Sequence, residues 1–256
     1  MTDWTLITGA SEGLGREFAD IAAASGRSVI VSARQKDKLE ALAAELRTRH
    51  SAEAFVLPVV LWRPGEAERL WAAAADGRRI DILVNNAGLG YNGAFAGEDI
   101  GRETATLSVN AVALTVLMQE AVRHMLASGG GRIMNVASTA AFMPGPGMAV
   151  YHATKAYVLS LSEAVADELR GKPVTVTAFC PGATATNFAR DAQMEGITLF
   201  KMGGLPSARS VADTGWRGML AGRRVVVTGS MNKVFAFLPR LLPRSLVTRV
   251  AGVFLR

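Results

Sequence analysis

The sequence of 256 residues predicts an α/β protein in which one doubly wound parallel sheet carries helices on both faces. Three observations predict this fold. Short apolar runs alternate with longer segments of helical periodicity along most of the chain. The apolar runs are nearly continuous, as expected of parallel strands that are buried on both faces. No repeat or linker interrupts the pattern, so we expect a single domain.

Seven apolar runs predict the strands, from WTLITG near the N-terminus to RRVVVTG near the C-terminus. The strands are expected at residues 4–9, 28–34, 52–60, 80–88, 131–138, 174–182 and 223–229. Between them, apolar residues recur at helical spacing, and a glycine closes the first helix. The helices are expected at residues 15–26, 37–50, 65–77, 99–127 and about 150–170.

Composition sets the class of protein. Half of the residues are hydrophobic and 26 are glycines, which suits a packed globular chain. No apolar run reaches the ~18–20 residues of a membrane span, and no basic n-region indicates a signal peptide. One cysteine, Cys180, cannot form an internal disulfide, so we expect a cytoplasmic protein. His50, His124 and His152 lack the spacing of metal ligands, and we expect no metal site.

Charge is unevenly distributed along the chain. There are 28 basic and 22 acidic residues, giving a net charge of +6, yet all acidic residues lie at or before Asp213. Eight basic residues follow, so the excess of positive charge belongs to the C-terminal segment. A nucleic-acid-binding face needs basic groups gathered on the body of the protein. We therefore expect no nucleic-acid partner.

The first expected strand leads into TGASEGLG, a glycine turn that opens a helix, and this context gives such a motif its meaning. Gly9 permits a tight turn, and Gly13 lets a pyrophosphate approach backbone N–H groups at the positive helix end. Gly15 permits close packing of helix and strand. The alternative is a glycine-rich turn that binds nothing, which the flanking strand and helix disfavour.

The end of the second strand, VSARQ, bears on the choice of cofactor. A carboxylate here binds the ribose 2′-hydroxyl of NAD, whereas an arginine suits the 2′-phosphate of NADP. In this sequence Ala33 is followed by Arg34, whose guanidinium can bind a phosphate in bidentate fashion. We therefore expect NADP(H), although Glu12 in the glycine turn would not help to bind a phosphate. A solvated strand-end charge is the alternative.

Residues 151–155 read YHATK and place a phenol and an ammonium on one face of a helix. The unperturbed pKa values are about 10 for tyrosine and about 10.4 for lysine. Two interpretations of Tyr151 and Lys155 remain open from these residues alone. They form either a surface pair without a task, or a lysine that lowers the pKa of a tyrosine so that it moves protons near neutrality.

The glycine turn, NNAG at residues 85–88, Asn110, Ser138 and Tyr151-x-x-x-Lys155 occur in this order. In combination they strongly resemble the classical short-chain dehydrogenase/reductase family. The resemblance implies a single Rossmann-like domain with a seven-stranded parallel sheet. It also implies hydride transfer between a nicotinamide and the carbonyl or alcohol carbon of a small molecule.

The resemblance covers residues 4 to about 230 and carries site residues over by position. Four residues match the family's catalytic set, namely Asn110, Ser138, Tyr151 and Lys155. The expected cofactor-binding residues are Gly9, Ser11, Glu12, Gly13, Leu14, Gly15, Arg34, Asn86, Ala87, Gly88, Tyr151, Lys155, Pro181, Gly182 and Thr184.

The resemblance also implies a role for each catalytic residue. Tyr151 would donate a proton to the carbonyl oxygen, and Lys155 would lower the pKa of Tyr151 and hold the nicotinamide ribose. Ser138 would orient the substrate oxygen, and Asn110 would hold a water that relays protons to Lys155. Each residue alone has an ordinary structural explanation, but their joint occurrence behind a nucleotide turn favours catalysis.

The position after the third strand departs from the family pattern, and the single cysteine has no partner in the motif. After the third strand the family usually has an aspartate that contacts adenine, and Val60 or Leu61 stands there instead. Either Trp62 or Arg63 closes the adenine pocket, or Trp62 simply packs at the sheet edge, which we favour slightly. Cys180 has no basic neighbour in sequence, so we expect a buried, inert thiol.

The segment between Ala183 and Pro206 is expected to close over the nicotinamide, and its apolar side chains suit an apolar substrate. Packing of this loop on the body of the protein is an equal alternative. The candidate lining residues are Phe142, Met143, Met148, Phe188, Met194, Ile197, Leu199, Phe200, Met202 and Leu205.

Residues 1–230 are expected to form the catalytic domain and residues 231–256 a basic, apolar extension on or near the substrate side. After Pro243, apolar residues recur at helical spacing, which predicts a lid or subunit-contact helix with at most weak membrane attraction. The stripe comprises Leu246, Val247, Val250, Val253 and Phe254. We expect a homodimer or homotetramer. Two rival functions are a non-catalytic NADP-binding redox sensor and a membrane-surface reductase of 3-oxoacyl or ketosteroid-like lipids.

Overall fold

The structure is a computed structural model that describes residues 3–193 and 204–255. Seven strands form one sheet in the order β3-β2-β1-β4-β5-β6-β7, and every pair of neighbours is parallel. The strands are β1 Asp3–Thr8, β2 Ser28–Ala33, β3 Ala54–Pro58, β4 Arg79–Asn85, β5 Gly131–Val136, β6 Val174–Cys180 and β7 Val225–Val227. The predicted seven-stranded parallel sheet is confirmed, and most strands end a few residues earlier than the apolar runs.

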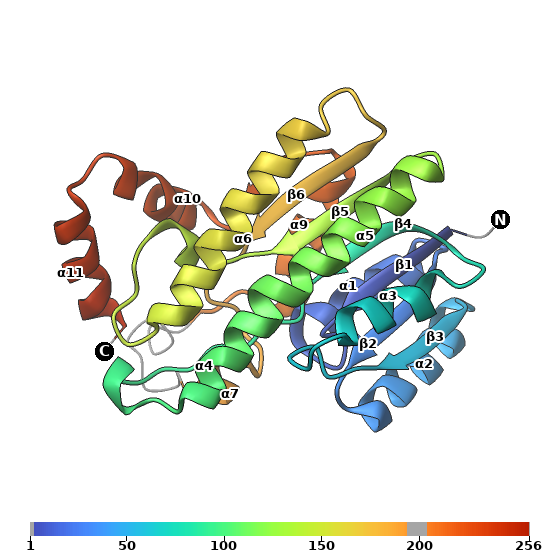
Figure 1. The fold of residues 1–256 in the computed structure, drawn as a ribbon, viewed down its shortest axis with the longest axis horizontal. Coiled ribbons are helices and arrows are strands. Elements are labelled where there is room, and N and C mark those ends of the chain that lie inside the picture. Colours follow the sequence, from blue (N-terminus) through green and yellow to red (C-terminus); the bar gives the residue numbers. More distant parts are fainter. Residues whose placement is uncertain (1–2, 194–203, 256) are drawn as a thin grey trace.

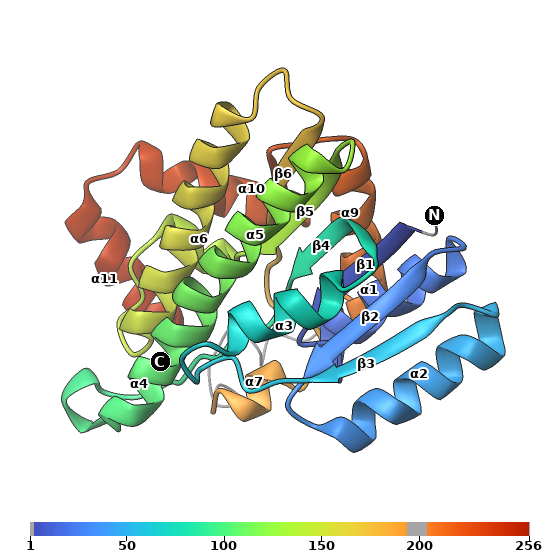
Figure 2. The same ribbon diagram turned by 45° about the vertical axis from the view of Figure 1, so that its right-hand side comes forward.

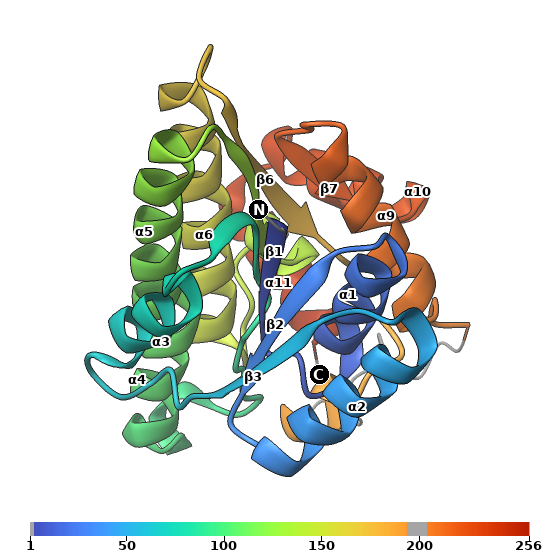
Figure 3. The same ribbon diagram turned by 90° about the vertical axis from the view of Figure 1, so that its right-hand side faces the viewer.

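Helices cover both faces of the sheet, as the sequence predicts. In the edge-on view of Figure 3, α3, α5 and α6 lie on one side of the sheet, and α1, α2 and α9 lie on the other. The helices are α1 Gly13–Ala24, α2 Lys36–His50, α3 Glu66–Ala75, α4 Ile100–Leu107, α5 Leu114–Ala127, α6 Ala149–Glu168, α7 Phe188–Asp191, α9 Ala208–Leu220, α10 Ser230–Phe237 and α11 Arg244–Phe254.

The continuous apolar strands feed two cores, one on each face. In β1, Leu6 packs into the core beneath α3 and α5, whereas Ile7 packs into the core beneath α1, α2 and α9. Both side chains are fully buried. Because successive side chains of a strand point to opposite faces, a strand buried on both sides is predominantly apolar along its whole length.

The strand order places a switch point between β1 and β4. From β1 the chain winds outward to β2 and β3, and then crosses back to β4 on the other side of β1 (Figure 1). Helices packed on opposite faces diverge at this point, which opens a crevice beyond the carboxyl ends of the two strands. Ligands of open α/β sheets bind in such a crevice.

The expected helix over residues 99–127 is present but not uniform. A π-helical stretch, η2 Ser108–Ala113, separates α4 from α5. Within the combined run Ile100–Ala127, an 18-residue stretch has a mean hydropathy of 1.4, so by length and composition the run could cross a membrane, contrary to our expectation. It packs against the sheet, however, with Leu117 and Met125 in the core, as a core helix does.

The C-terminal segment adds α10, a short 3₁₀ turn η4 Leu238–Arg240, and α11. Figures 1 and 2 both show these helices at the end of the molecule opposite β3, with α11 outermost. Gly252 of α11 lies against Pro146, where an added Cβ atom would stand 3.3 Å from the proline ring. The small side of α11 therefore faces the loop that precedes α6.

Candidate active site

The glycine turn lies at the carboxyl end of β1 and has the backbone that its sequence requires. Gly9 and Gly13 adopt φ values of +65° and +57°, which side chains with a Cβ atom rarely adopt. At Gly15 an added Cβ atom would stand 2.1 Å from the Gly9 carbonyl oxygen. The turn and α1 therefore approach each other more closely than any larger residue permits.

The amino end of α1 is available to an anion. Glu12 occupies the N-cap position, but its side chain makes no capping hydrogen bond among the described residues. The N–H groups of the first helical turn, from Gly13 to Gly15, thus have no partner inside the helix. Such N–H groups and the helix dipole suit a pyrophosphate, so the residues present fit a dinucleotide.

The NNAG segment braces the glycine turn from β4. The Asn86 amide donates to the carbonyl oxygens of Thr8 at 3.0 Å and Gly9 at 3.1 Å. In return, the Thr8 hydroxyl accepts the N–H groups of Asn86 and Ala87, both at 3.0 Å. The two segments that flank the switch point are therefore locked together. Thr8 was not among the predicted site residues, although it directly precedes the first glycine.

Glu12 turns away from the helix end and links two other elements. Its carboxylate accepts hydrogen bonds from the Asn187 amide at 3.0 Å and from Lys38 at 3.3 Å. These bonds hold the pKa of Glu12 below its usual value, and the bond from Asn187 has the largest effect. The side chain therefore connects the glycine turn to the start of α7, a contact that the sequence did not reveal.

Arg34 and Trp62 stack at the ends of neighbouring strands. The guanidinium of Arg34 lies 5.2 Å from the centre of the Trp62 ring, a cation–π distance. Arg34 is exposed, and Trp62 packs partly buried on the core beneath α3, as we slightly favoured. The structure therefore leaves an exposed guanidinium beside an aromatic ring at the carboxyl edge of the sheet.

Asn110 lies in the π-helix and is 1% exposed. Its amide nitrogen donates to the Leu89 carbonyl at 2.8 Å and to the Thr154 hydroxyl at 3.0 Å. Its oxygen accepts the Leu89 N–H at 2.8 Å. Beside it, an added Cβ atom at Gly88 would stand 3.4 Å from the Asn110 oxygen and 3.5 Å from the Lys155 nitrogen. Asn110 therefore reaches the neighbourhood of Lys155.

Ser138, Tyr151 and Lys155 come together where β5 meets the start of α6. Ser138 caps η3 Thr139–Phe142, and its hydroxyl accepts the N–H of Ala140 at 3.1 Å. Lys155 is buried, donates to the Val136 carbonyl at 2.8 Å, and lies 5.6 Å from the centre of the Tyr151 ring. Tyrosine, lysine and serine thus share one site, as the motif spacing predicts.

The acid–base properties of the pair differ from our expectation. Burial raises the pKa of Tyr151 to about 12, while the Ser138 hydroxyl acts in the opposite direction. Burial also lowers the pKa of Lys155 to about 8. Burial of the phenol therefore dominates the pKa of Tyr151 in this structure, while the Lys155 ammonium bonds the Val136 carbonyl. The lowering of this pKa by Lys155 stays a prediction.

The segment after β6 joins the site to the C-terminal helices. The Pro181 carbonyl accepts the N–H of Thr139 at 2.9 Å, and the Thr184 hydroxyl donates to the Gly182 carbonyl at 2.9 Å. An added Cβ atom at Gly182 would stand 2.2 Å from the Asn232 amide of α10. These contacts order the segment beside Ser138.

Cys180, at the end of β6, is fully buried. Burial raises the pKa of its thiol to about 12, so the thiolate that nucleophilic chemistry needs is suppressed at neutral pH. The predicted burial of this cysteine is confirmed, and its inertness stays a prediction.

An apolar wall stands beside Tyr151. Met148, Ala192 and Leu255 form a buried cluster against which Tyr151 and Phe188 pack. The rings of Tyr151 and Phe188 lie 5.5 Å apart between centroids. Leu255 directly follows α11, so the C-terminal segment reaches the wall, and it was not among the predicted lining residues.

The other predicted lining residues are not part of this apolar wall among the described contacts. Phe142 packs on the core between β6 and α6, and the Met143 carbonyl is paired with the ring of His152 at 2.8 Å. Leu205 is half-buried. The remaining ones, Met194, Ile197, Leu199, Phe200 and Met202, lie outside the described residues.

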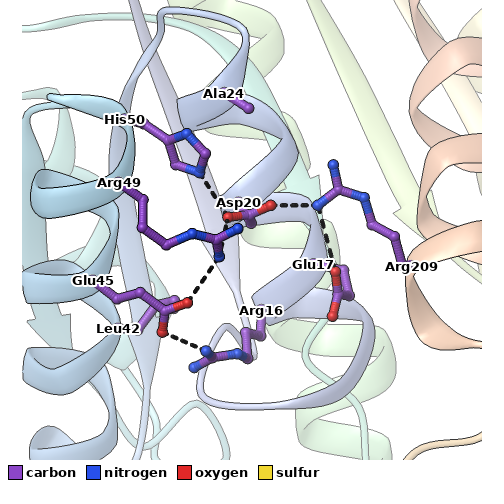
Figure 4. Close-up of a pocket in the computed structure, with 9 residues that line it drawn as sticks. All are labelled: Arg16, Glu17, Asp20, Ala24, Leu42, Glu45, Arg49, His50 and Arg209. Carbon is purple, nitrogen blue, oxygen red and sulfur yellow. Dashed lines mark hydrogen bonds and ion pairs between the residues drawn. The ribbon is translucent and has the colours of Figure 1, made fainter.

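A separate pocket of about 350 Å³ lies between α1, α2 and α9 (Figure 4). At its centre Asp20 pairs with His50 at 2.7 Å, with Arg49 at 3.1 Å and with Arg209. Burial alone would raise the pKa of Asp20, but its hydrogen bonds with His50 and Arg209, together with the positive charges nearby, hold that pKa below the usual value. The charges of this cluster satisfy one another, which suits a structural role.

The parallel doubly wound sheet and the glycine turn at its switch point define a dinucleotide-binding protein of the Rossmann class. The family model described as short chain dehydrogenase matches residues 3–195. The chain therefore belongs to the short-chain dehydrogenase/reductase family, and it is an oxidoreductase with a nicotinamide cofactor.

Individual relatives agree with this assignment. A 3-oxoacyl-[acyl-carrier-protein] reductase from Synechocystis sp. is 33% identical over 206 residues, which are 80% of this chain and 81% of that protein. A 7beta-hydroxysteroid dehydrogenase from Collinsella aerofaciens is 32% identical over 184 residues, 72% of this chain and 70% of that protein. The structure of a short-chain dehydrogenase from Sphingobium yanoikuyae in complex with NADPH superposes with a TM-score of 0.84 at 31% identity, covering 91% and 90% of the two chains.

Proposed function

We propose that the chain is an NADP(H)-dependent oxidoreductase that acts on the carbonyl or alcohol carbon of an apolar small molecule. The observation that carries this proposal is the position of Tyr151. Its ring lies near Lys155 and packs, together with Phe188, on the apolar wall of Met148, Ala192 and Leu255. A carbonyl next to the phenol would have its apolar substituents against this wall.

The chain's own residues supply proton transfer and positioning. When bound, the nicotinamide supplies or accepts the hydride. With a pKa of about 12, the phenol of Tyr151 keeps its proton at neutral pH and is ready to donate it to a substrate oxygen. The Ser138 hydroxyl can orient that oxygen.

The dinucleotide would lie along the carboxyl edge of the sheet. The N–H groups at the start of α1 would hold its pyrophosphate, and Lys155 and Asn110 lie where its nicotinamide end belongs. Arg34 supports NADP(H) over NAD(H), because it offers an exposed guanidinium where a carboxylate would bind the 2′-hydroxyl. Trp62 stacks on that guanidinium and restrains it.

A carbonyl screen with spectrophotometric detection tests the proposal. Purified chain is mixed with NADPH or NADH and with ketones, aldehydes and long-chain 3-oxo compounds, and loss of reduced-cofactor absorbance is followed. We expect turnover of apolar ketones with NADPH. Binding of NADPH with no turnover of any carbonyl would favour the rival redox-sensor function.

We also propose a cytoplasmic homodimer or homotetramer. The outer side of the α4–α6 layer carries exposed apolar side chains, among them Leu107, Val112 and Tyr157. Exposed apolar patches on a soluble chain often mark subunit contacts. Light scattering on wild type and on a Val112→Glu variant would test this assembly, and a monomeric wild type would contradict it.

A further inference from the structure

The predicted apolar stripe of α11 faces outward rather than inward. Val247 is buried, as expected for a lid on the body of the protein, but Leu246, Val250 and Val253 are 43%, 46% and 66% exposed. Spaced by four and three residues, these three share one face of the helix. The buried side of α11 consists of Val247 and small residues, together with Leu255 at its end. α11 therefore does not use its larger apolar side chains to cover the body.

Helix α10, which precedes α11, also turns a row of apolar side chains outward. In α10 and the turn that follows, Met231, Val234, Phe235 and Leu238 are exposed and stand at i, i+3, i+4 and i+7. Only Ala236 of α10 is buried. Of the eighteen large hydrophobic side chains that are exposed among the described residues, ten lie between Met231 and Phe254. The C-terminal segment therefore holds more than half of them in 24 residues.

Positive charge surrounds these side chains. Lys233, Arg240, Arg244 and Arg249 are exposed, and no acidic residue follows Asp213. Arg249 stands three residues after Leu246 and four before Val253, so it adjoins the outward stripe. Exposed apolar stripes beside arginines, with no carboxylate, match the surface of a bilayer that contains anionic lipids.

A second copy of the chain fits this surface less well. Most homo-oligomers are built from two-fold contacts in which the same patch meets itself. Here such a contact would place arginines of one copy against arginines of the other, with no carboxylate of the segment to pair with them. Like charges brought together in this way oppose association.

We propose that the surface of α10, η4 and α11 docks onto an anionic lipid bilayer. The outward stripes enter the boundary between head groups and acyl chains, and the surrounding lysine and arginines contact the lipid head groups. Figures 1 and 2 show that this segment lies at one end of the molecule, with α11 outermost, so that a flat bilayer can reach it.

The docking surface is joined to the proposed active site. Leu255, directly after α11, packs with Met148 in the cluster that supports Tyr151. Docking would bring the apolar wall of the site close to a lipid phase. The substrate class that we infer from this position rests on the proposed function. The substrate class that follows is an apolar carbonyl compound dissolved in the membrane, such as a long-chain ketone, and not one held only in water.

Vesicle co-sedimentation tests the docking on the full chain. One vesicle type contains about 30 mol % phosphatidylserine in phosphatidylcholine, and the other is phosphatidylcholine alone, both at physiological ionic strength. We expect the wild type to pellet with the anionic vesicles at least about tenfold more strongly than with the neutral ones. Equal pelleting with both, or none with either, overturns the proposal.

Two sets of variants separate the contributions. The triple variant R240Q/R244Q/R249Q removes charge from the surface, and its matched control R63Q/K172Q/R217Q removes three exposed charges elsewhere. The variant L246S/V250S/V253S removes the outward stripe of α11. We expect the charge variant R240Q/R244Q/R249Q and the stripe variant L246S/V250S/V253S each to bind anionic vesicles about tenfold more weakly or worse. The control variant should bind them as the wild type does.

Circular dichroism checks that each variant folds. If the stripe variant does not fold, the charge variant still tests the proposal.

Light scattering tests whether a second copy of the chain covers this surface instead of a bilayer. If the stripe variant becomes a smaller assembly than wild type while the charge variant still binds vesicles, the surface is a subunit contact and the proposal is wrong. Vesicle binding needs no turnover, so its result stands apart from failure of the carbonyl screen. Faster reduction of a long-chain ketone in anionic than in neutral vesicles would support the membrane-dissolved substrate class.

Discussion

The side chain of Asn110 makes two hydrogen bonds with the backbone of Leu89, donating to its carbonyl and accepting its N–H, both at 2.8 Å. Asn110 belongs to the π-helix between α4 and α5, whereas Leu89 follows the NNAG segment after β4. The pair therefore clamps the loop that carries Gly88 to the core. π-Helical turns are often found at functional sites. Here the turn directs a buried amide toward this loop.

Asn110→Ala should lower the free energy of unfolding by about 1–3 kcal/mol, because two partly buried backbone groups of Leu89 lose their partner. Chemical denaturation measures this loss. Ser108→Ala, in the same π-helix, is the control, since its hydroxyl only returns to the Thr104 carbonyl. If both variants unfold at the same denaturant concentration, the clamp is not structural.

Gly15→Ala should abolish NADPH binding and destabilise the fold. The new Cβ atom would stand 2.1 Å from the Gly9 oxygen and 2.5 Å from the Asn86 amide, so the glycine turn must move. Cofactor fluorescence and thermal denaturation provide the two measurements. Gly97→Ala serves as the control, because nothing lies within 4 Å of its added Cβ atom. Normal NADPH affinity in the Gly15 variant would show that the turn does not bind the cofactor.

Tyr151→Phe should reduce turnover far more than tenfold while NADPH affinity stays nearly unchanged. The ring still packs against Phe188, but the proton for the substrate oxygen is lost. Tyr157→Phe removes a hydroxyl from the exposed side of the same helix, where it is 2.8 Å from Thr115, and should leave turnover unaffected. Retention of a tenth or more of the rate, a barrier change under ~1.4 kcal/mol, would exclude Tyr151 as the acid.

Arg34→Ala should remove most of the preference for NADPH over NADH. The guanidinium that would contact the 2′-phosphate is lost, whereas NADH keeps its own contacts. Calorimetric titration of both cofactors measures the preference in each variant. Arg123→Ala, on α5, removes an arginine elsewhere and should keep it. Equal affinity of wild type for the two cofactors would contradict the NADP(H) assignment.

Most strands could be predicted from the sequence because burial on both faces leaves a direct signal, a nearly continuous apolar run such as residues 28–34. The edge strands β3 and β7 are only partly buried, but their apolar runs are still long enough to be recognised. The order of the strands could not be predicted, because pairing depends on contacts between distant segments. The glycine turn and the Tyr151–Lys155 pair could also be predicted, because both depend on residues close together in the sequence. Local backbone geometry fixes where their side chains lie relative to one another.

Other features depend on tertiary packing. The π-helix around Asn110 needs one extra residue in a turn, and it leaves no change in the periodicity of residues 99–127. The outward direction of Leu246 and Val250 depends on which side of α11 fits the body, and the small Gly252 decides it. The Lys155–Val136 hydrogen bond likewise joins α6 to β5 and has no local signal.

The pKa of Tyr151 in the structure differs from the pKa expected from the sequence. The family resemblance implies a phenol with a lowered pKa, whereas burial in the structure raises it to about 12. Because the folded value lies above the unperturbed value of about 10, the folded chain keeps this proton longer than the unfolded chain. The free energy of unfolding should therefore fall as pH rises from about 10 to about 12.

Ultraviolet difference titration of the cofactor-free chain against Tyr151→Phe measures this ionisation directly, since tyrosinate absorbs where phenol does not. We expect the difference signal to begin only above about pH 10, while circular dichroism confirms that the chain is still folded. Lys155→Met is the informative companion. With Lys155 bonded to the Val136 carbonyl, its removal should change the midpoint little. A wild-type midpoint well below 10 that rises in Lys155→Met would restore the lysine-activated phenol and overturn the conclusion drawn from burial.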